Sequence, residues 1–149
     1  MSFFFCNSLF AATDACWKNE INPTTQKTYS SQAEYQNDLA KWNKQSNWVN
    51  PIQLARAYQV YVQEKAHSLT LESDKMSHCY IGCRIRQKTD FKTVRYVAWL
   101  KEKQDLTDCD PNSHFEIQDF NATILGGVYL VTTAEQCLST CRQELPRLQ

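Results

Sequence analysis

The strongest candidate for catalytic chemistry in this sequence is a carboxylate four residues before a histidine. Asp74 and His78 stand at i and i+4, so on a helix they share one face and the carboxylate can orient the imidazole. An imidazole oriented in this way can serve as a general base. Three acidic residues complete the cluster if their helices pack against this one: Glu102, Asp105 and Asp119. The alternative is a structural histidine at the edge of a buried face.

The sequence gives no reason to expect a metal or another cofactor. It contains only three histidines, and the C-x2-C knuckles typical of structural zinc sites are absent. Its three glycines leave little material for a phosphate-binding loop. A cysteine nucleophile is disfavoured because paired cysteines in an oxidising compartment are bonded and inert. Whether the protein is an enzyme stays open at this point.

Six of the seven cysteines are expected to form three disulfides: Cys16, Cys79, Cys83, Cys109, Cys137 and Cys141. Two C-x3-C pairs, at 79–83 and 137–141, each place two thiols on one face of a helix. Antiparallel helices would pair Cys79 with Cys141, and parallel helices would pair Cys79 with Cys137. Cys83 takes the remaining partner in either case, and Cys16 is left for Cys109. The pattern predicts a helical hairpin joined by two disulfides.

The amino-terminal residues suggest export from the cytoplasm. Residues 1–13 carry no charge, and an apolar run ends in small residues, as in a secretory signal cleaved after Ala11. Cleavage would remove Cys6 and leave an even number of cysteines. The signal is incomplete because no basic residue precedes the run, and the alternative is an apolar segment packed on the core. We expect a secreted or periplasmic protein.

Composition and charge bound the remaining classes. The 149 residues match one domain, which we place at 12–149, and 42% hydrophobic residues suffice for a core. Equal numbers of acidic and basic residues remove the main electrostatic argument for nucleic acid as a partner. No apolar run reaches the roughly 20 residues of a membrane-spanning helix, so integral membrane association is not expected. Aromatic residues crowd the amino-terminal half, which suits either a protein or glycan partner or a packed core.

Helix-capping signals predict a single compact all-α domain. Ser31 with Glu34 forms a capping box for a helix over 32–42, and Asn50 before Pro51 begins a second. The second helix carries apolar residues at helical spacing, namely Leu54, Tyr58, Tyr61 and Val62. Ser73 or Asp74 can cap a third helix, and Asp90 a fourth whose apolar residues, Leu100 included, enter the core.

The carboxyl-terminal third yields three further expectations. A second capping box at 113–116 predicts a helix that stops at Gly126-Gly127. Residues 128–131 could form a short strand. Residues 132–135 open the last helix, which carries Cys137 and Cys141 and ends near Pro146.

Part of the chain resembles a known group of domains. The segment 77–84 reads SHCYIGCR, residues 99–102 read WLKE with Asp105 following, and residues 119–122 read DFNA before Gly126. From Asp74 to Cys141 this is similar to the helical His-Cys-Tyr domains at the carboxyl termini of RHS-type bacterial polymorphic toxins and in small secreted bacterial proteins. The sequence departs from that pattern at 87–89, where a glycine is expected.

This resemblance implies a secreted bacterial protein with an effector role, and it assigns no reaction. We expect a disulfide-stabilised, toxin-like helical protein that acts by binding a protein or glycan partner. The alternative is a small secreted hydrolase that uses His78 and Asp74 with Glu102 and Asp119.

Overall fold

The fold is all-α, as the sequence predicts. A computed structural model describes residues 16–44, 48–110 and 112–148, apart from the side chain of Cys16, so the expected signal segment at 1–11 lies outside the described residues. The described helices are η1 (Cys16–Lys18), α1 (Gln32–Lys44), α2 (Pro51–Ser68), α3 (Asp74–Arg86), α4 (Phe91–Thr107), α5 (Ile117–Val128), α6 (Ala134–Glu144) and η2 (Leu145–Leu148). No described helix combines the length and apolar character that a membrane crossing requires.

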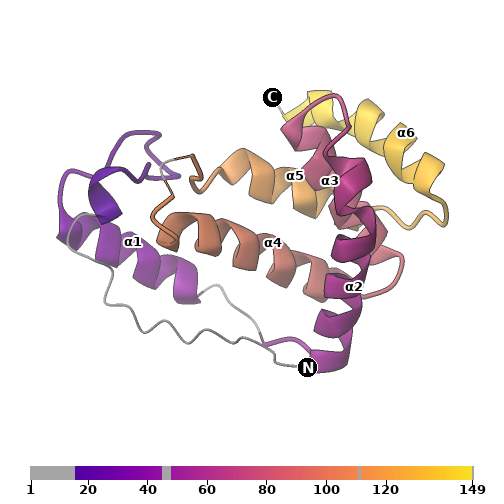
Figure 1. Ribbon diagram of the computed structural model, residues 1–149, viewed down its shortest axis with the longest axis horizontal. Coiled ribbons are helices and arrows are strands. Elements are labelled where there is room, and N and C mark those ends of the chain that lie inside the picture. Colours follow the sequence, from indigo (N-terminus) through magenta and orange to yellow (C-terminus); the bar gives the residue numbers. More distant parts are fainter. Residues whose placement is uncertain (1–15, 45–47, 111, 149) are drawn as a thin grey trace.

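Helix α3 lies at the centre of the packing. It contacts α2, α4, α5 and α6, and its closest neighbour is α5. Figure 1 shows α1 at one end of the elongated molecule and α6 at the other, with α4 and α5 running side by side between them. Each face of α3 therefore meets a different neighbour.

Local capping begins most of the helices where the sequence places them. The side chains of Asn50, Ser73 and Asp90 accept hydrogen bonds from first-turn amides of α2, α3 and α4. Such caps satisfy amides that the helix itself cannot. Helix α6 has a capping box, but Thr133 pairs with Gln136, one residue later than the sequence suggests.

Two glycines let α3 and α5 approach until their backbones touch. A Cβ on Gly82 would fall 2.1 Å from the carbonyl oxygen of Thr123, and one on Gly126 would fall 1.9 Å from that of Cys79. The prediction that the helix stops at Gly126-Gly127 is therefore wrong. Helix α5 runs through Gly126 and Gly127 to Val128, because these two glycines make room for the neighbouring helices α3 and α4 rather than for a turn.

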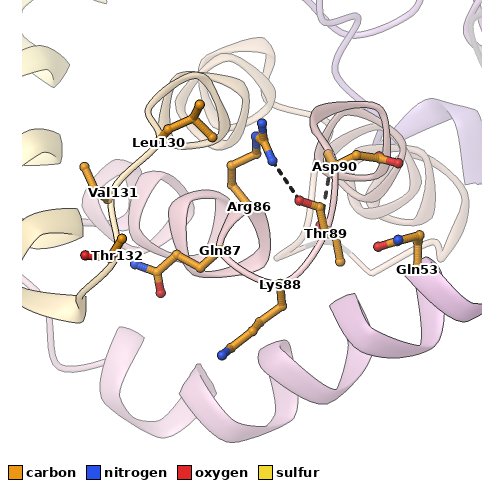
Figure 2. A pocket seen from close by; sticks show the side chains of 9 residues that line it. All are labelled: Gln53, Arg86, Gln87, Lys88, Thr89, Asp90, Leu130, Val131 and Thr132. Atoms are coloured by element: carbon orange, nitrogen blue, oxygen red, sulfur yellow. Dashed lines mark hydrogen bonds between the residues drawn. The ribbon is translucent and has the colours of Figure 1, made fainter.

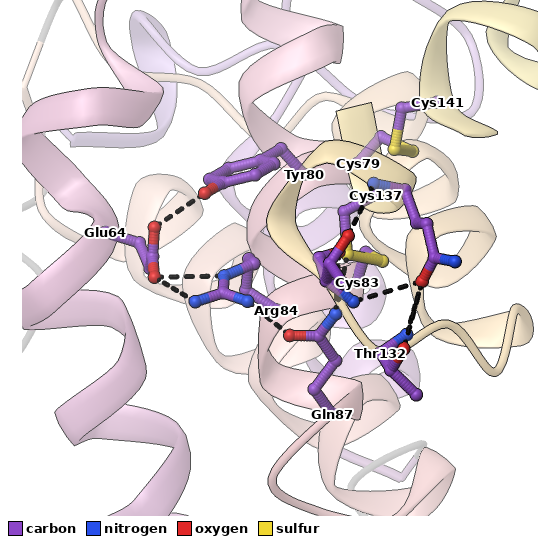
Figure 3. The surroundings of a disulfide bond; sticks show 11 residues. Glu64, Cys79, Tyr80, Cys83, Arg84, Gln87, Thr132, Cys137 and Cys141 are labelled. Carbon is purple, nitrogen blue, oxygen red and sulfur yellow. Dashed lines mark hydrogen bonds and ion pairs between the residues drawn. A yellow bond between two sulfur atoms is a disulfide. The ribbon is translucent and has the colours of Figure 1, made fainter. Parts of the chain in front are cut away.

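The disulfides join α3 to α6 in the antiparallel arrangement. Cys79 bonds Cys141 and Cys83 bonds Cys137, and all four side chains are buried. Figure 3 shows the Cys83–Cys137 bond on one face of α3, while Tyr80 and Arg84 on the same helix point to Glu64 of α2. Cys109 is also disulfide-bonded. Its predicted partner, Cys16, has a side chain outside the described residues.

Two expectations for the carboxyl-terminal third fail. Helix α5 begins at Ile117 rather than at a capping box over 113–116, and its first residue is preceded by Glu116, which makes no side-chain cap. The reason is Phe115, which turns into the core and packs against Trp42 in a tilted arrangement with 4.3 Å between ring centroids. No strand forms at 128–131, and the described residues contain only an isolated bridge between Ile21 and Thr28.

An aromatic core fixes α1 against α4. It consists of Tyr29, Tyr35, Trp42, Trp99, Leu106 and Phe115. The polar ends of these rings are satisfied, since the Tyr35 hydroxyl donates to the Leu106 carbonyl at 2.9 Å and the Trp99 indole donates to the Trp42 carbonyl at 2.6 Å. The hydroxyl of a buried tyrosine and the indole N–H of a buried tryptophan usually have such partners. Leu100, in contrast, lies on the exposed side of α4, contrary to the sequence expectation.

Candidate functional site

The structure brings three of the four predicted site residues together. Asp74 and His78 lie one turn apart on α3, and Asp119 on α5 faces them. His78 Nε2 is 3.8 Å from Oδ1 of Asp74 and 3.6 Å from Oδ2 of Asp119. Asp74 is 67% exposed and Asp119 only 9%, so the cluster has a solvent side and a buried side. We call Asp74, His78 and Asp119 the Asp-His-Asp cluster.

Lys75 binds the same two carboxylates through their other oxygens. Its ammonium contacts Oδ1 of Asp119 and lies 3.8 Å from Oδ2 of Asp74, and it also binds Glu116 at 2.7 Å. Each aspartate therefore turns one oxygen to Lys75 and the other to His78. Lys75 was not predicted from the sequence. The available signal was its position next to Asp74, because a predicted acidic cluster favours a neighbouring cation.

Thr123 holds the opposite side of the His78 ring. Its hydroxyl lies 3.1 Å from Nδ1 of His78 and donates to the Asp119 carbonyl at 3.0 Å. The close approach of α3 and α5 at Gly82 brings Thr123 to this position. Thr123 was not predicted, because only the register of the two helices reveals it.

Burial dominates the protonation of the cluster. The pKa of Asp119 is raised to about 7. Burial is the largest cause, Lys75 opposes the increase, and the charge of Asp74 adds to it. Burial also lowers the pKa of His78, although the charge of Asp74 acts in the opposite direction. Charged forms are disfavoured where water is excluded. His78 is therefore neutral at pH 7, and Asp119 exchanges a proton near that pH.

Glu102, the fourth predicted residue, lies beside the cluster but makes no ion pair with it. Its carboxylate accepts a hydrogen bond from the Glu116 amide at 3.0 Å, which fixes the start of α5. Burial raises its pKa to about 8, and the charges of Asp119 and Asp105 add to the effect. Asp105 pairs with Lys101 on its own helix. Glu102 is therefore a largely protonated buried acid at neutral pH.

The Asp-His-Asp cluster is the one place among the described residues where three potential metal ligands converge. One ligand atom from each residue lies within 4.8 Å of the others. Two chemistries are open to this arrangement: His78 could act as a base, or the three residues could coordinate a cation.

A separate pocket of about 460 Å³ lies between the α3–α4 turn and residues 130–132, as Figure 2 shows. Much of its polar lining already has structural partners, whereas the buried Oε1 of Gln53 has none among the described residues. Arg86 donates to the Thr89 carbonyl, the Thr89 hydroxyl donates to the Ile85 carbonyl, and Asp90 caps α4. The pocket therefore lies over the end of α3 and the start of α4, and none of the predicted site residues lines it.

A second feature is an apolar stripe on the outer side of α2. Tyr58 and Val62 of α2 and Leu69, which caps the carboxyl-terminal end of α2 in a helical conformation, follow at intervals of four and seven residues. This spacing places them on one side of the helix, and each is more than half exposed. Ala57 and Val60 are buried on the other side. The smaller apolar side chains of α2 therefore face the core, and Tyr58 and Val62 face outward. We call Tyr58, Val62 and Leu69 the α2 stripe.

Fold and site together define a disulfide-joined all-α domain with a partly buried Asp-His-Asp cluster. Two internal disulfides are characteristic of proteins that fold in an oxidising compartment. No protein-family model matches the chain, and no curated protein or solved structure is significantly similar to it.

Proposed function

We propose that this chain is a secreted, toxin- or effector-like protein that acts by binding a partner protein through the α2 stripe. The supporting observation is the exposure of Tyr58, Val62 and Leu69 on a helix whose other side is already packed. Large apolar side chains gathered on one exposed helix face are typical of binding surfaces. The two disulfides provide a rigid scaffold that suits an extracellular role.

The geometry of the α2 stripe favours a protein partner with an apolar groove. In Figure 1, α2 runs beside α3 at the edge of the helical packing. A helix that presents apolar anchors at intervals of four and seven residues can lie in a hydrophobic groove. A glycan would instead stack on single exposed rings such as Trp48, which precedes α2.

A growth assay tests this proposal. The protein is directed to the periplasm of a reporter bacterium, and inhibition is compared for the wild type and a Tyr58→Glu/Val62→Glu variant. Both positions are exposed, so the variant should fold, and circular dichroism checks that it does. The matched control is Gln59→Glu/Gln63→Glu, at exposed polar positions of the same helix. We expect the stripe variant to lose inhibition and the control to keep it. A harmless wild type, or an equally active stripe variant, would overturn the proposal.

The second candidate function is a small secreted hydrolase. The observation that favours it is the position of His78 Nε2 within 3.8 Å of two carboxylates, one of them open to solvent. In this mechanism His78 is the general base and the carboxylates stabilise its protonated form. The same assay separates the two functions, because His78→Ala would abolish inhibition by a hydrolase and leave partner binding through α2 intact.

A further inference from the structure

The hydrogen bonds around His78 determine which ring nitrogen carries the proton. The Thr123 hydroxyl has a single proton, and it donates that proton to the Asp119 carbonyl. The 3.1 Å contact between Thr123 Oγ1 and His78 Nδ1 is a hydrogen bond only if Nδ1–H is the donor. A neutral His78 therefore carries its proton on Nδ1, and Nε2 has a free lone pair.

That lone pair faces two carboxylate oxygens. Nε2 faces Oδ1 of Asp74 and Oδ2 of Asp119, while Lys75 occupies the other oxygen of each carboxylate. Asp119 is more than nine-tenths buried, so water cannot readily solvate the oxygen that faces Nε2. Three electron-pair donors that face one point repel each other unless a proton or a metal cation lies between them.

The local charge also favours a divalent ion. When Asp119 is ionised, the carboxylates of Asp74, Asp119 and Glu116 surround a single ammonium, that of Lys75, which leaves two negative charges unbalanced. A neutral imidazole adds a ligand without adding charge.

We propose that His78 Nε2, Asp74 Oδ1 and Asp119 Oδ2 bind one divalent transition-metal ion of the zinc type. Tetrahedral ligands about 2.0–2.2 Å from such an ion lie roughly 3.3–3.6 Å from one another. His78 Nε2 is 3.8 Å from Asp74 Oδ1 and 3.6 Å from Asp119 Oδ2, and all three ligand atoms lie within 4.8 Å of one another, so a small inward movement completes the site. Mixed imidazole and carboxylate donors suit zinc and its first-row neighbours. The exposed side of Asp74 provides the entry path.

Lys75 and Thr123 are the positioning residues of this site. Thr123 accepts from Nδ1–H and thereby turns Nε2 to the ion, and Lys75 holds each carboxylate by the oxygen that the ion does not use. Metal-binding histidines generally have such a partner on the second nitrogen. A site with three protein ligands leaves a coordination position for water. The proposal is independent of partner binding, since it uses only residues of α3 and α5.

The intact, oxidised protein is first treated with a chelator and dialysed. Calorimetric titration with zinc then tests the site. We expect one zinc ion per chain. His78→Ala and Asp119→Asn should abolish that binding, and Thr123→Val should weaken it roughly 10- to 100-fold, with Thr123→Ser restoring it. Asp74→Asn should also abolish zinc binding. Because position 74 is exposed, this variant should fold even if the variants at buried positions do not. The matched control is His67→Ala, which removes a histidine of α2 and should leave zinc affinity unchanged.

Nitrogen NMR of the histidine rings gives a readout that needs no activity. The metal-free wild type should show the Nδ1–H form of His78, and zinc should shift the Nε2 resonance. An Nε2–H form, an absence of zinc binding, or zinc binding that survives Asp74→Asn would each overturn the proposal. None of these outcomes bears on the growth assay, so failure of the metal site and failure of partner binding are distinguishable.

Discussion

Gly126 meets the backbone of Cys79 so closely that a Cβ on the glycine would fall 1.9 Å from the cysteine carbonyl oxygen. Gly82 makes the reciprocal contact from α3 to the backbone of Thr123 on α5. These two contacts set the register of α3 against α5. The same register places Thr123 and Asp119 beside His78, so the site depends on glycines that touch none of its ligands.

Gly126→Ala should destabilise the protein by about 1–3 kcal/mol, because the added methyl group forces the two backbones apart. The higher helix propensity of alanine offsets only about 1 kcal/mol of this. Urea denaturation measures the change. Gly127→Ala is the matched control, since its methyl group meets the side chain of Val94 at 2.6 Å rather than a backbone carbonyl at 1.9 Å, and the loss should be smaller. Equal losses at the two positions would contradict the role given to the backbone contact.

Glu102→Gln should raise the thermal midpoint at pH 8 and reduce the dependence of stability on pH. The pKa of Glu102 is raised to about 8 in the fold, so the folded state holds this proton more tightly than the unfolded chain. Stability must then fall as pH rises from about 4.5 to 8. Asp119 and Glu20, whose pKa values rise to about 7, add to this slope below neutrality. Glutamine keeps the acceptor for the Glu116 amide without the charge. Melting curves from pH 5 to 8 test the prediction, and a wild type that is most stable at pH 8 would refute it.

Glu64→Gln should cost about 1–3 kcal/mol, since hydrogen bonds to a charged group are stronger than neutral ones. Glu64 on α2 accepts from the Tyr80 hydroxyl at 2.7 Å and from Arg84 Nε at 3.0 Å, as Figure 3 shows. Burial alone would raise its pKa, but these hydrogen bonds hold it below the usual value. The contribution of Glu64 to stability is fully present above its pKa in the unfolded chain, near 4.5. It is lost as the pH falls through the lower pKa that Glu64 has in the folded protein.

The control for Glu64 is Glu72→Gln. Glu72 pairs with Arg142, and more than half of each side chain is exposed. Exposed ion pairs contribute little, so chemical denaturation should show no resolvable change in the free energy of unfolding. If the two glutamine variants lose the same stability, the hydrogen bonds between α2 and α3 do not contribute as proposed.

Removing the Cys83–Cys137 bond by a double change to alanine should cost about 2–4 kcal/mol. The bond closes a loop with a sequence separation of 54, and the Cys79–Cys141 bond closes one of 62, so the two losses should be similar. Guanidinium denaturation of both double variants makes the comparison. Peptide mapping of the unreduced wild type should recover the same two pairs, and the crossed pairing would contradict the antiparallel arrangement.

Local signals in the sequence predicted where several helices begin. Asn50, Ser73 and Asp90 cap as expected because a cap depends on residues within one turn. The start of α5 was missed because Phe115 is drawn into the core by Trp42, a residue far away in the chain. The glycines of α5 were misread for the same reason, since their role depends on α3 and α4.

The candidate site was predictable only in part. Asp74 and His78 could be paired from their spacing on one helix, and Asp119 was proposed as a member of the cluster. Its distance from His78, and the contacts of Lys75 and Thr123, depend on the packing of α3 against α5. The exposed α2 stripe could not be foreseen from apolar spacing, because spacing identifies a face and does not say whether a neighbour covers it.

Both mapped disulfides connect α3 to α6, while α4 and α5 lie within the chain that they enclose. A protease that cuts the exposed turn near Asp108 would therefore leave two fragments held together by covalent bonds. The nicked protein would migrate as one species until a reductant separates the fragments. The connection between these two helices thus keeps a chain that is cut once in a single covalent molecule under oxidising conditions.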